Sequence, residues 1–516
     1  MAGRKAADKN AIVDKVIKSI NEKNKTQEPT SSLDQNMAII EALFSDVDIL
    51  RTKIIQNSRY PELRYGIIFC DGVIDSAIIN DNILRPLMLT DTAKPGSQLM
   101  ETLMKQVIQI GEAELCSDFA KIIEAICYGD TVLFAEGVNQ ALILNTKGFP
   151  TRTTSEPENE RSLSGPREGF TESIMQNLSF VRRKLRTNEL KMKFLSVGKR
   201  SNTSLCLCYI NSIADQKMLD EVMRRLNQID IDAILDSNYI TELIRDKRWA
   251  LFRSIGYTER PDVVVAKLLE GRIAIFVDGT PVVLTVPYLF IENFQSNEDY
   301  YLSFYYTSYS RLLRIIGFIL TICVPGIFIA VVAFHHEMLP TALLINIAAE
   351  RQSVPLPAAL EAFIMLVVFD ILRETGIRMP SNVGQALSIV GALVIGQAAV
   401  EAKMVAAPMI IVVGITGITN LLVPKLNAPV IYFRFFVLLS SSIFGFFGFV
   451  ISVSCLLIHI FNLTSLGIPQ VVLDGSYRHQ QIKDIVIRVP WWQMILRPPL
   501  MTQNITRLKQ KDGENA

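Results

Sequence analysis

The sequence predicts an α/β soluble region of two related subdomains, followed by an all-α polytopic membrane domain. The first observation is the distribution of charge: the chain has 52 Lys and Arg and 51 Asp and Glu residues, and only 13 of them lie between 312 and 461. The second is the run 312–334, which contains no acidic residue. At about 1.5 Å per residue this run would extend about 34 Å as a helix, enough to cross the hydrocarbon core of a bilayer.

The third observation is an internal repeat in the soluble region. Residues 65–88 and 205–227 each have the pattern of a buried strand, a turn and an amphipathic helix. Each segment is followed by a predicted β-hairpin that begins at Gly129 or Gly271, and each hairpin has a second glycine eight residues later. A glycine at that place supplies the positive φ of a hairpin turn. The spacing therefore predicts two related α/β subdomains.

These patterns divide the chain into six parts. We predict a flexible N-terminal segment (1–39), a first α/β cytoplasmic subdomain (40–148) and a linker with a basic helix (149–199). These are followed by a second α/β cytoplasmic subdomain (200–300), a transmembrane helical domain (301–465) and a cytoplasmic tail (466–516). The N-terminus has no apolar core of signal-peptide length, which favours a cytoplasmic location for the large N-terminal region. The basic tail favours the same side of the membrane.

Several functional classes are not supported. The net charge of +1, without a basic groove or stacking aromatic residues, gives no reason to expect nucleic acid as a partner. Five of the seven cysteines lie in the soluble region, where they have neither disulfide nor metal-site spacing. Phosphate-binding glycine loops, GxSxG and HExxH are missing from the sequence, so we expect neither an enzyme nor a cofactor.

The second predicted span, 357–373, carries Glu361 and Asp370. An acidic group at the centre of a lone membrane helix costs about 2.5–3.5 kcal/mol on insertion scales, so such groups face a partner or water. One interpretation is structural pairing with Arg373, Arg378 or a neighbouring subunit. The other is a place on an ion path.

The third predicted span, 383–400, has two distinct patterns. Small residues recur every four positions and would let another helix approach closely, at Gly384, Ser388, Ala392 and Gly396. In a ring of identical subunits another face of this helix would line an axial hole, with a candidate hydrophobic gate that closes by dewetting at Val383, Val390 and Val394, and with Gln397 as a polar pore candidate.

The last apolar run, 430–461, has 32 residues, or about 48 Å as one helix, which is longer than a bilayer requires. Gly445 and Gly448 are candidate break points. Five crossings would place the basic tail opposite the N-terminal region. Either 341–349 helps to complete another crossing, or 430–461 makes two.

Two long motifs resemble a known family. The segment 165–185, "GPREGFTESIMQNLSFVRRKL", resembles the linker signature of the A subunits of GerA-type spore germination receptors. The membrane segments 334–357 and 361–402 follow in the order seen in that family. The resemblance covers nearly the whole chain.

The resemblance implies a subunit in the inner membrane of bacterial endospores, in contact with membrane lipid. Its implied partners are a transporter-like B subunit, a lipoprotein C subunit and further copies of itself in a homo-oligomer. The complex would sense small nutrients and start germination with ion release through a nutrient-gated path. Two alternatives remain: a non-conducting scaffold that couples the B subunit to later events, and a secondary transporter, although no inverted repeat is evident.

Overall fold

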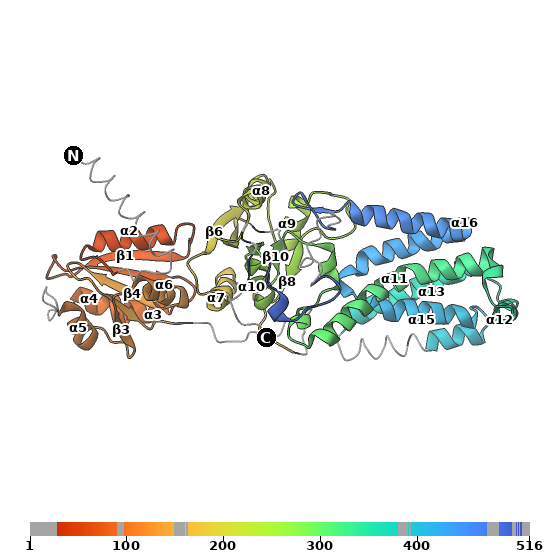
Figure 1. Ribbon diagram of the computed structural model, residues 1–516, viewed down its shortest axis with the longest axis horizontal. Helices are drawn as coiled ribbons and strands as arrows, with labels where there is room; N and C mark the ends of the chain where they lie inside the picture. The colour runs from red at the N-terminus through yellow and green to blue at the C-terminus, as the bar shows by residue number, and fades with distance from the viewer. Residues whose placement is uncertain are drawn as a thin grey trace, which may run out of the picture. The chain divides into compact units, whose positions relative to one another are not determined.

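The computed structural model describes residues 28–89, 98–148, 160, 164–379, 391, 394–471, 484–497, 502, 504, 506 and 507. The chain forms two compact units. The α/β unit comprises Met1–Arg245, Ile255–Pro287 and Ile495–Ala516, and the helical unit comprises Asp246–Ser254 and Tyr288–Met494. Figure 1 labels their helices and strands.

The first repeat of the α/β unit contains one five-stranded antiparallel sheet in the order β1-β2-β4-β5-β3. Its elements are α2 (Leu33–Leu43), β1 (Leu50–Gln56), β2 (Arg64–Cys70), α3 (Ser76–Ile78), η1 (Ile79–Leu84), α4 (Arg85–Leu89), α5 (Leu99–Thr102), η2 (Leu103–Val107), β3 (Ala113–Cys116), α6 (Phe119–Tyr128), β4 (Thr131–Ala135) and β5 (Ala141–Leu144).

The second repeat has the equivalent sheet order, β6-β7-β9-β10-β8. Its elements are α7 (Ile174–Lys184), β6 (Leu190–Val197), β7 (Thr203–Ile210), α8 (Gln216–Asn227), α9 (Ser237–Ile244), β8 (Gly256–Thr258), α10 (Pro261–Leu269), β9 (Ile273–Val277) and β10 (Val283–Val286). The matching topology confirms the predicted pair of related α/β subdomains (Figure 1).

Local chemistry fixes the same backbone in both repeats. Asp75 accepts a hydrogen bond from the amide of Ala77 at 2.9 Å, and Asp215 accepts one from the amide of Lys217 at 3.0 Å, so an aspartate caps the helix after the second strand in each repeat. The hairpin glycines Gly137 and Gly279 have φ of 83° and 84°, which confirms the positive φ predicted for these turns.

The repeat unit begins with the helix before its first strand. The Asn36 side chain is hydrogen bonded to both backbone groups of Thr30, and Asn177 is bonded in the same way to Thr171. Both asparagines are buried. The second repeat therefore includes α7 and β6, which lie inside the segment 149–199 that the sequence suggested as a linker with a basic helix.

The central strands carry the core of the α/β unit. Every residue of β4 and of β9 is buried. Because successive side chains of a strand point to opposite faces, both faces of these strands are covered. One continuous apolar core includes residues of both repeats.

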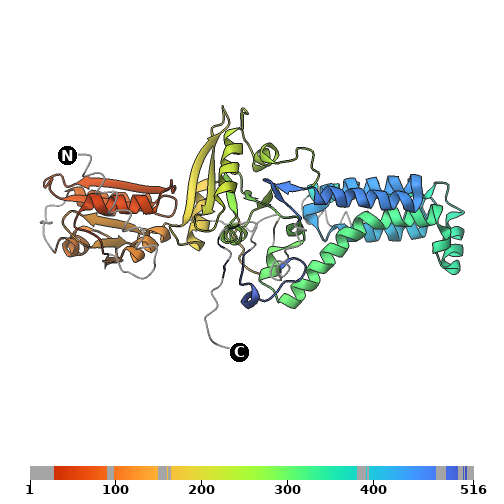
Figure 2. The ribbon, with the colours of Figure 1, turned by 45° about the horizontal axis from the view of Figure 1, so that its top comes forward.

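The helical unit contains α11 (Phe304–Phe334), α12 (Thr341–Arg351), α13 (Ala358–Arg378), α15 (Ala407–Asn420) and α16 (Asn427–Phe461), with residues 394–401 also helical. Figure 2 shows the long helices lying side by side. Among the described residues, two segments are long and apolar enough to cross a membrane, Phe304–Phe334 and Pro424–Phe461. This confirms the predicted helical region with apolar helices.

The helix α16 reverses direction at Gly445, where φ is 61° and ψ is −139°. The rings of Phe433 and His459 are 5.7 Å apart, although 26 residues of one straight helix would extend about 39 Å. A Cβ added at Gly448 would lie 2.1 Å from the carbonyl oxygen of Ser440. The two halves of α16 therefore pack against each other as an antiparallel pair. This is the arrangement expected from the alternative in which 430–461 makes two crossings.

The chain enters and leaves the helical bundle at the same end. Thr321, in the middle of α11, donates a hydrogen bond at 2.8 Å to Thr419 near the end of α15, whereas Ile329, further along α11, shares an apolar cluster with Met409 near the start of α15, so these two helices are antiparallel. The residues just after α16 return to the segment that precedes α11, because the hydroxyl of Ser465 accepts a hydrogen bond from the amide of Tyr288 at 3.0 Å. The passes through the bundle thus bring the chain back to the side from which it entered.

Candidate functional site

A buried ion pair joins α13 to α16 inside the apolar bundle. The Asp370 carboxylate lies 2.5 Å from a guanidinium nitrogen of Arg434, whose side chain is fully buried. Arg373, one turn further along α13, lies 3.9 Å from the other Asp370 oxygen. The bond to Arg434 joins residues 64 positions apart. Removing one partner of such a pair costs about 3–5 kcal/mol, because the other charge remains buried without compensation.

The sequence analysis did not single out Arg434. The signal that could have found it is simple: Arg434 is the sole Lys, Arg, Asp or Glu within the apolar run 430–461. A charge in such a run needs a partner, and Asp370 is one of the two acidic groups of the predicted second span. Local periodicity does not say which helix of the bundle supplies that partner.

Glu361 has a different environment from Asp370. Its side chain is 1 % exposed, and one carboxylate oxygen accepts a hydrogen bond from the amide of Ala406 at 2.6 Å. Ala406 is the residue that precedes α15, so the carboxylate lies at the positive end of that helix. Among the described residues, the other oxygen of Glu361 has no hydrogen-bond partner.

The predicted pore helix is described only from residue 394 onward, apart from residue 391. Val394 is 57 % exposed, and the exposed Gln397 donates a hydrogen bond to Glu401 at 2.9 Å. Gly396 is buried, and a Cβ there would lie 3.9 Å from the Ile410 side chain of α15. The remaining predicted residues of this helix lie outside the described residues: Val383, Gly384, Ser388, Val390 and Ala392.

A second ionic cluster lies where α11 begins. Asp299 is 1 % exposed and binds Arg311 at 2.8 Å and Arg314 at 3.0 Å. Arg311 also binds Asp484 at 2.8 Å, and the hydroxyl of Tyr300 donates to Asp484 at 2.7 Å. Asp484 belongs to the tail, so this cluster holds the tail against the first helix of the bundle.

The basic helix α7 does not present its charges to solvent as a free face. Arg182 is fully buried, and Arg183 and Lys184 both pair with Glu168. The guanidinium of Arg186 lies 3.4 Å from the centre of the Tyr128 ring. All three cations of α7, and Arg186 after it, thus have a contact within the α/β unit.

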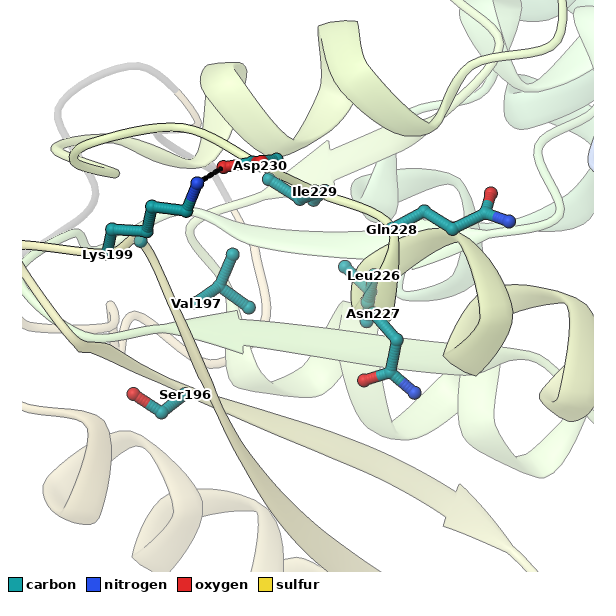
Figure 3. Close-up of a pocket in the computed structure, with 9 residues that line it drawn as sticks. Ser196, Val197, Lys199, Leu226, Asn227, Gln228, Ile229 and Asp230 are labelled. Carbon is teal, nitrogen blue, oxygen red and sulfur yellow. Dashed lines mark ion pairs between the residues drawn. The ribbon is translucent and has the colours of Figure 1, made fainter.

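An open hollow of about 390 Å³ lies at one end of the second sheet. It is formed by the turn after β6 and by the residues that follow α8 (Figure 3). The two charged groups that border it, Lys199 and Asp230, pair with each other at 2.6 Å and are both exposed. Among the described residues, no group of three or more His, Cys, Asp or Glu side chains could hold a metal ion.

These features define a two-part protein: a duplicated α/β unit and an apolar helical bundle with buried ion pairs. The sequence profile of the Bacillus/Clostridium GerA spore germination protein family matches residues 37–500. The chain therefore belongs to the GerA family of spore germination proteins, which confirms the resemblance found in its motifs.

Individual relatives agree with this assignment. The chain is 39% identical over 472 residues to spore germination protein KA of Bacillus subtilis, which covers 91% of this chain and 86% of the relative. It is 40% identical over 456 residues to the uncharacterized membrane protein YfkQ of the same organism, covering 87% of this chain and 88% of the relative.

A solved structure is also similar. The crystal structure of the N-terminal domain of the A subunit of the Bacillus megaterium spore germinant receptor GerK3 aligns with 31% sequence identity and a TM-score of 0.42. The alignment covers 52% of this chain and 99% of that domain.

Proposed function

We propose that this chain is a membrane-embedded A subunit of a nutrient receptor, and that several copies assemble into a ring that encloses a nutrient-gated ion path. The helix that spans residues 383–400 would line that path. The partners would be a transporter-like B subunit and a lipoprotein C subunit in the inner membrane of the spore. The α/β unit would lie on the cytoplasmic side.

The outer surface of the bundle supports embedding in a membrane. Large apolar side chains on both halves of α16 are exposed, among them Leu439 at 61 %, Phe447 at 69 % and Ile458 at 67 %. Soluble monomers rarely expose continuous apolar surface of this kind, because it costs free energy in contact with water. A bilayer would cover these side chains without that cost.

The observation that carries the pore proposal is the two-sided helix at 394–401. Gly396 is buried on the side of Ile410, while Val394 and Gln397 are exposed. Positions 394, 397 and 401 are three or four residues apart and thus share one face of a helix. In a ring of copies, one face of the helix would pack within its own subunit and this second face would point to the axis.

The ionic groups of the bundle suit a rigid wall better than a direct ion ligand. Asp370 is matched by Arg434 at 2.5 Å and by Arg373 at 3.9 Å, so its charge is already compensated. Glu361 is directed at the amide of Ala406. We therefore assign the ion path to the exposed face with Val394 and Gln397, and assign the ion pairs to fixing α13 against its neighbours.

The test is cation release from spores that carry Val394→Ala together with the partner subunits. Without nutrient, a smaller side chain at a hydrophobic gate weakens dewetting, so we expect a cation leak or spontaneous germination. The matched control is Ile418→Ala on α15, which truncates a β-branched residue that is 70 % exposed. We expect the control to keep both dormancy and the nutrient response.

Two results would speak against the pore. Normal dormancy in Val394→Ala spores, with a normal amount of receptor, would remove Val394 as a gate. An altered receptor assembly with unchanged conductance would favour the non-conducting scaffold.

A further inference from the structure

The chain contains three tryptophans, and all three are exposed in the helical unit. Trp249 is 94 % exposed, Trp492 is 71 % exposed and Trp491 is 49 % exposed. Trp249 lies in Asp246–Ser254, a segment that connects α9 to β8 of the second repeat but belongs to the helical unit. An indole ring that is almost fully exposed to water loses the burial that stabilises tryptophans elsewhere.

The exposure of Trp249 is imposed by a segment that is fixed on both sides. Before it, Asp246 accepts a hydrogen bond from the amide of Gly467 at 2.8 Å, and the Lys247 ammonium donates to the carbonyl of Asn462 at 2.5 Å. After it, the carbonyl of Ser254 accepts from the hydroxyl of Ser465 at 2.5 Å.

Phe252 fixes the same segment through packing. Its ring stacks on Phe433 of α16 at 5.6 Å with an interplanar angle of 18°, and meets the ring of Phe290 edge-on at 5.4 Å. With its two flanks held and Phe252 buried, the segment has little freedom to fold Trp249 inward.

The contacts also place this segment beside the end of α16. Phe252 shares an apolar cluster with Phe318 in the middle of α11 and with Ile460 near the end of α16. Further exposed aromatic residues of the helical unit lie on the first two turns of α11: Tyr305, Tyr306 and Tyr309. Trp492 packs edge-on against Phe304 at 6.3 Å.

This combination of groups matches the chemistry of a membrane–water interface. Tryptophan and tyrosine concentrate there, because the ring contacts acyl chains while the polar atom remains hydrated. The segment also carries a net charge of +2, from Lys247, Arg248 and Arg253 against Asp246. Basic groups near the surface are attracted to anionic headgroups.

We propose that Asp246–Ser254 is a membrane-interface anchor, with Trp249 inserted at the headgroup level of a phospholipid bilayer and Arg248 facing anionic headgroups. The proposal rests on the membrane embedding proposed above. It gives the helical unit a lipid contact in a segment that interrupts the second α/β repeat in the sequence. The segment would then be fixed both to the bilayer and, through Phe252, to α16.

The test uses the full chain in vesicles of phosphatidylcholine and phosphatidylglycerol that contain brominated lipids, which quench tryptophan emission on contact. Trp491→Phe and Trp492→Phe together leave Trp249 as the sole tryptophan. We expect Trp249 to lose most of its emission when the bromines lie near the headgroup, and less when they lie deep in the acyl chain. Raising the salt concentration is expected to weaken the headgroup contact of Arg248.

The matched control is Phe436→Trp in a chain whose three native tryptophans are replaced by phenylalanine. Phe436 is 43 % exposed near the middle of the first half of α16, about 14 Å along that helix. Its tryptophan is expected to be quenched most by the deep bromines.

The outcomes separate the two proposals. If the tryptophan at 436 is quenched and Trp249 is not, the interface anchor is wrong while the embedded bundle stands. A Trp249 emission that is shifted to shorter wavelength without bromine quenching would indicate a protein partner, and would also overturn the anchor. If neither position is quenched, the bundle is not embedded in the bilayer and both proposals fail.

Discussion

The two α/β repeats are the same backbone used in two environments. Both have the strand order first-second-fourth-fifth-third, and in both the glycine of the central hairpin donates its amide to the segment before the first helix: Gly137 to Ser31 at 2.8 Å, and Gly279 to Glu172 at 2.9 Å. The first strands differ. Four successive residues in the middle of β1 are exposed, whereas β6 begins with three buried residues.

Contacts between the repeats explain this difference. The amide of Asp48, in the first repeat, donates to the carbonyl of Met192 in β6 at 3.0 Å, and the side chain of Asp48 accepts from the amide of Phe194 at 2.7 Å. Equivalent positions on the first helices have diverged accordingly: Glu41 is exposed on α2, whereas Arg182 is fully buried on α7. Residues that set the backbone are thus common to both repeats, while helix surfaces follow what packs on them.

The largest expected effect is the destabilisation caused by Gly129→Ala, which should exceed that of an alanine at other glycines with positive φ. Gly129 has φ of 97°, and a Cβ there would lie 2.8 Å from the carbonyl oxygen of Val73. Left-handed strain of about 1–2 kcal/mol and the overpacking together predict that Gly129→Ala destabilises the first repeat by about 2–4 kcal/mol. Hydrogen exchange of the β2 and β4 amides in the full chain measures this loss.

Gly137→Ala and Gly279→Ala are the controls for Gly129→Ala. Both glycines have positive φ but no atom within 4 Å of the added Cβ, so each substitution is expected to cost only about 1 kcal/mol. Equal losses at Gly129 and Gly137 would show that the contact with Val73 carries no energetic weight.

The second prediction tests whether the repeats have equivalent caps. Asn36 donates to the Thr30 carbonyl at 2.7 Å and accepts from its amide at 2.9 Å. The corresponding distances from Asn177 to Thr171 are 2.5 and 2.8 Å. Because each asparagine is buried, its replacement by alanine leaves two backbone groups unsatisfied and is expected to cost about 1–3 kcal/mol.

The two losses are expected to agree within about 0.5 kcal/mol when local hydrogen exchange is compared between repeats. Gln35→Ala, at the neighbouring and partly exposed position, is the control and is expected to have little effect. A loss at Asn36 several times that at Asn177 would mean that the caps are alike in geometry but not in energy.

The duplication could be predicted from the sequence, because the two hairpins have glycines at the same spacing and their turns require a residue that adopts positive φ. It also contained the start of each repeat, as "TSSLDQN" (30–36) and "TESIMQN" (171–177), although this similarity was not used. A buried asparagine at such a cap disrupts the apolar pattern of its helix, so periodicity alone does not mark the segment as part of a packed repeat.

Long-range pairing in the bundle was harder to predict. Gly445 was a candidate break point, but a glycine permits a kink as readily as a reversal, and the packing of Phe433 beside His459 decides between them. In the same way, the charge of Asp370 predicted a partner without specifying Arg434. Which helices become neighbours depends on packing over the whole bundle, and the local pattern of one helix does not contain that information.

The third prediction concerns Arg182, the buried counterpart of Glu41. One guanidinium nitrogen donates to the Thr187 carbonyl at 2.8 Å, while Nε and Nη2 have no hydrogen-bond partner in the described part of the chain. The nearby Cys127 thiol offers no negative charge at neutral pH, because burial raises its pKa to about 12. We therefore expect Arg182→Met, which keeps most of the volume, to change the free energy of unfolding by less than about 1 kcal/mol.

Arg182→Ala is the contrasting variant for this site. It leaves a cavity in the interface between the repeats and is expected to cost about 2–4 kcal/mol by the same exchange measurement. If Arg182→Met lowers the free energy of unfolding as much as Arg182→Ala does, the positive charge itself stabilises the interface. The comparison with Glu41 would then have to be revised.

The smallest expected effect lies in α8, which replaces the short helices α3, η1 and α4 of the first repeat. Hydrogen bonds from Arg224 and Arg225, each at 2.6 Å, lower the pKa of Glu221 from 4.5 to about 2. A lowered carboxyl pKa stabilises the fold above its unfolded value, so this contribution is present above about pH 4.5 and is lost as the pH falls toward 2. Because solvent reaches all three groups and screens their charges, Glu221→Gln is expected to cost less than about 1 kcal/mol at neutral pH. The difference between Glu221→Gln and the unchanged chain, followed by exchange of the α8 amides, should shrink below pH 4.5 and should have no counterpart in the first repeat. A difference that stays constant with pH would show that the two arginines stabilise α8 by packing and not by charge.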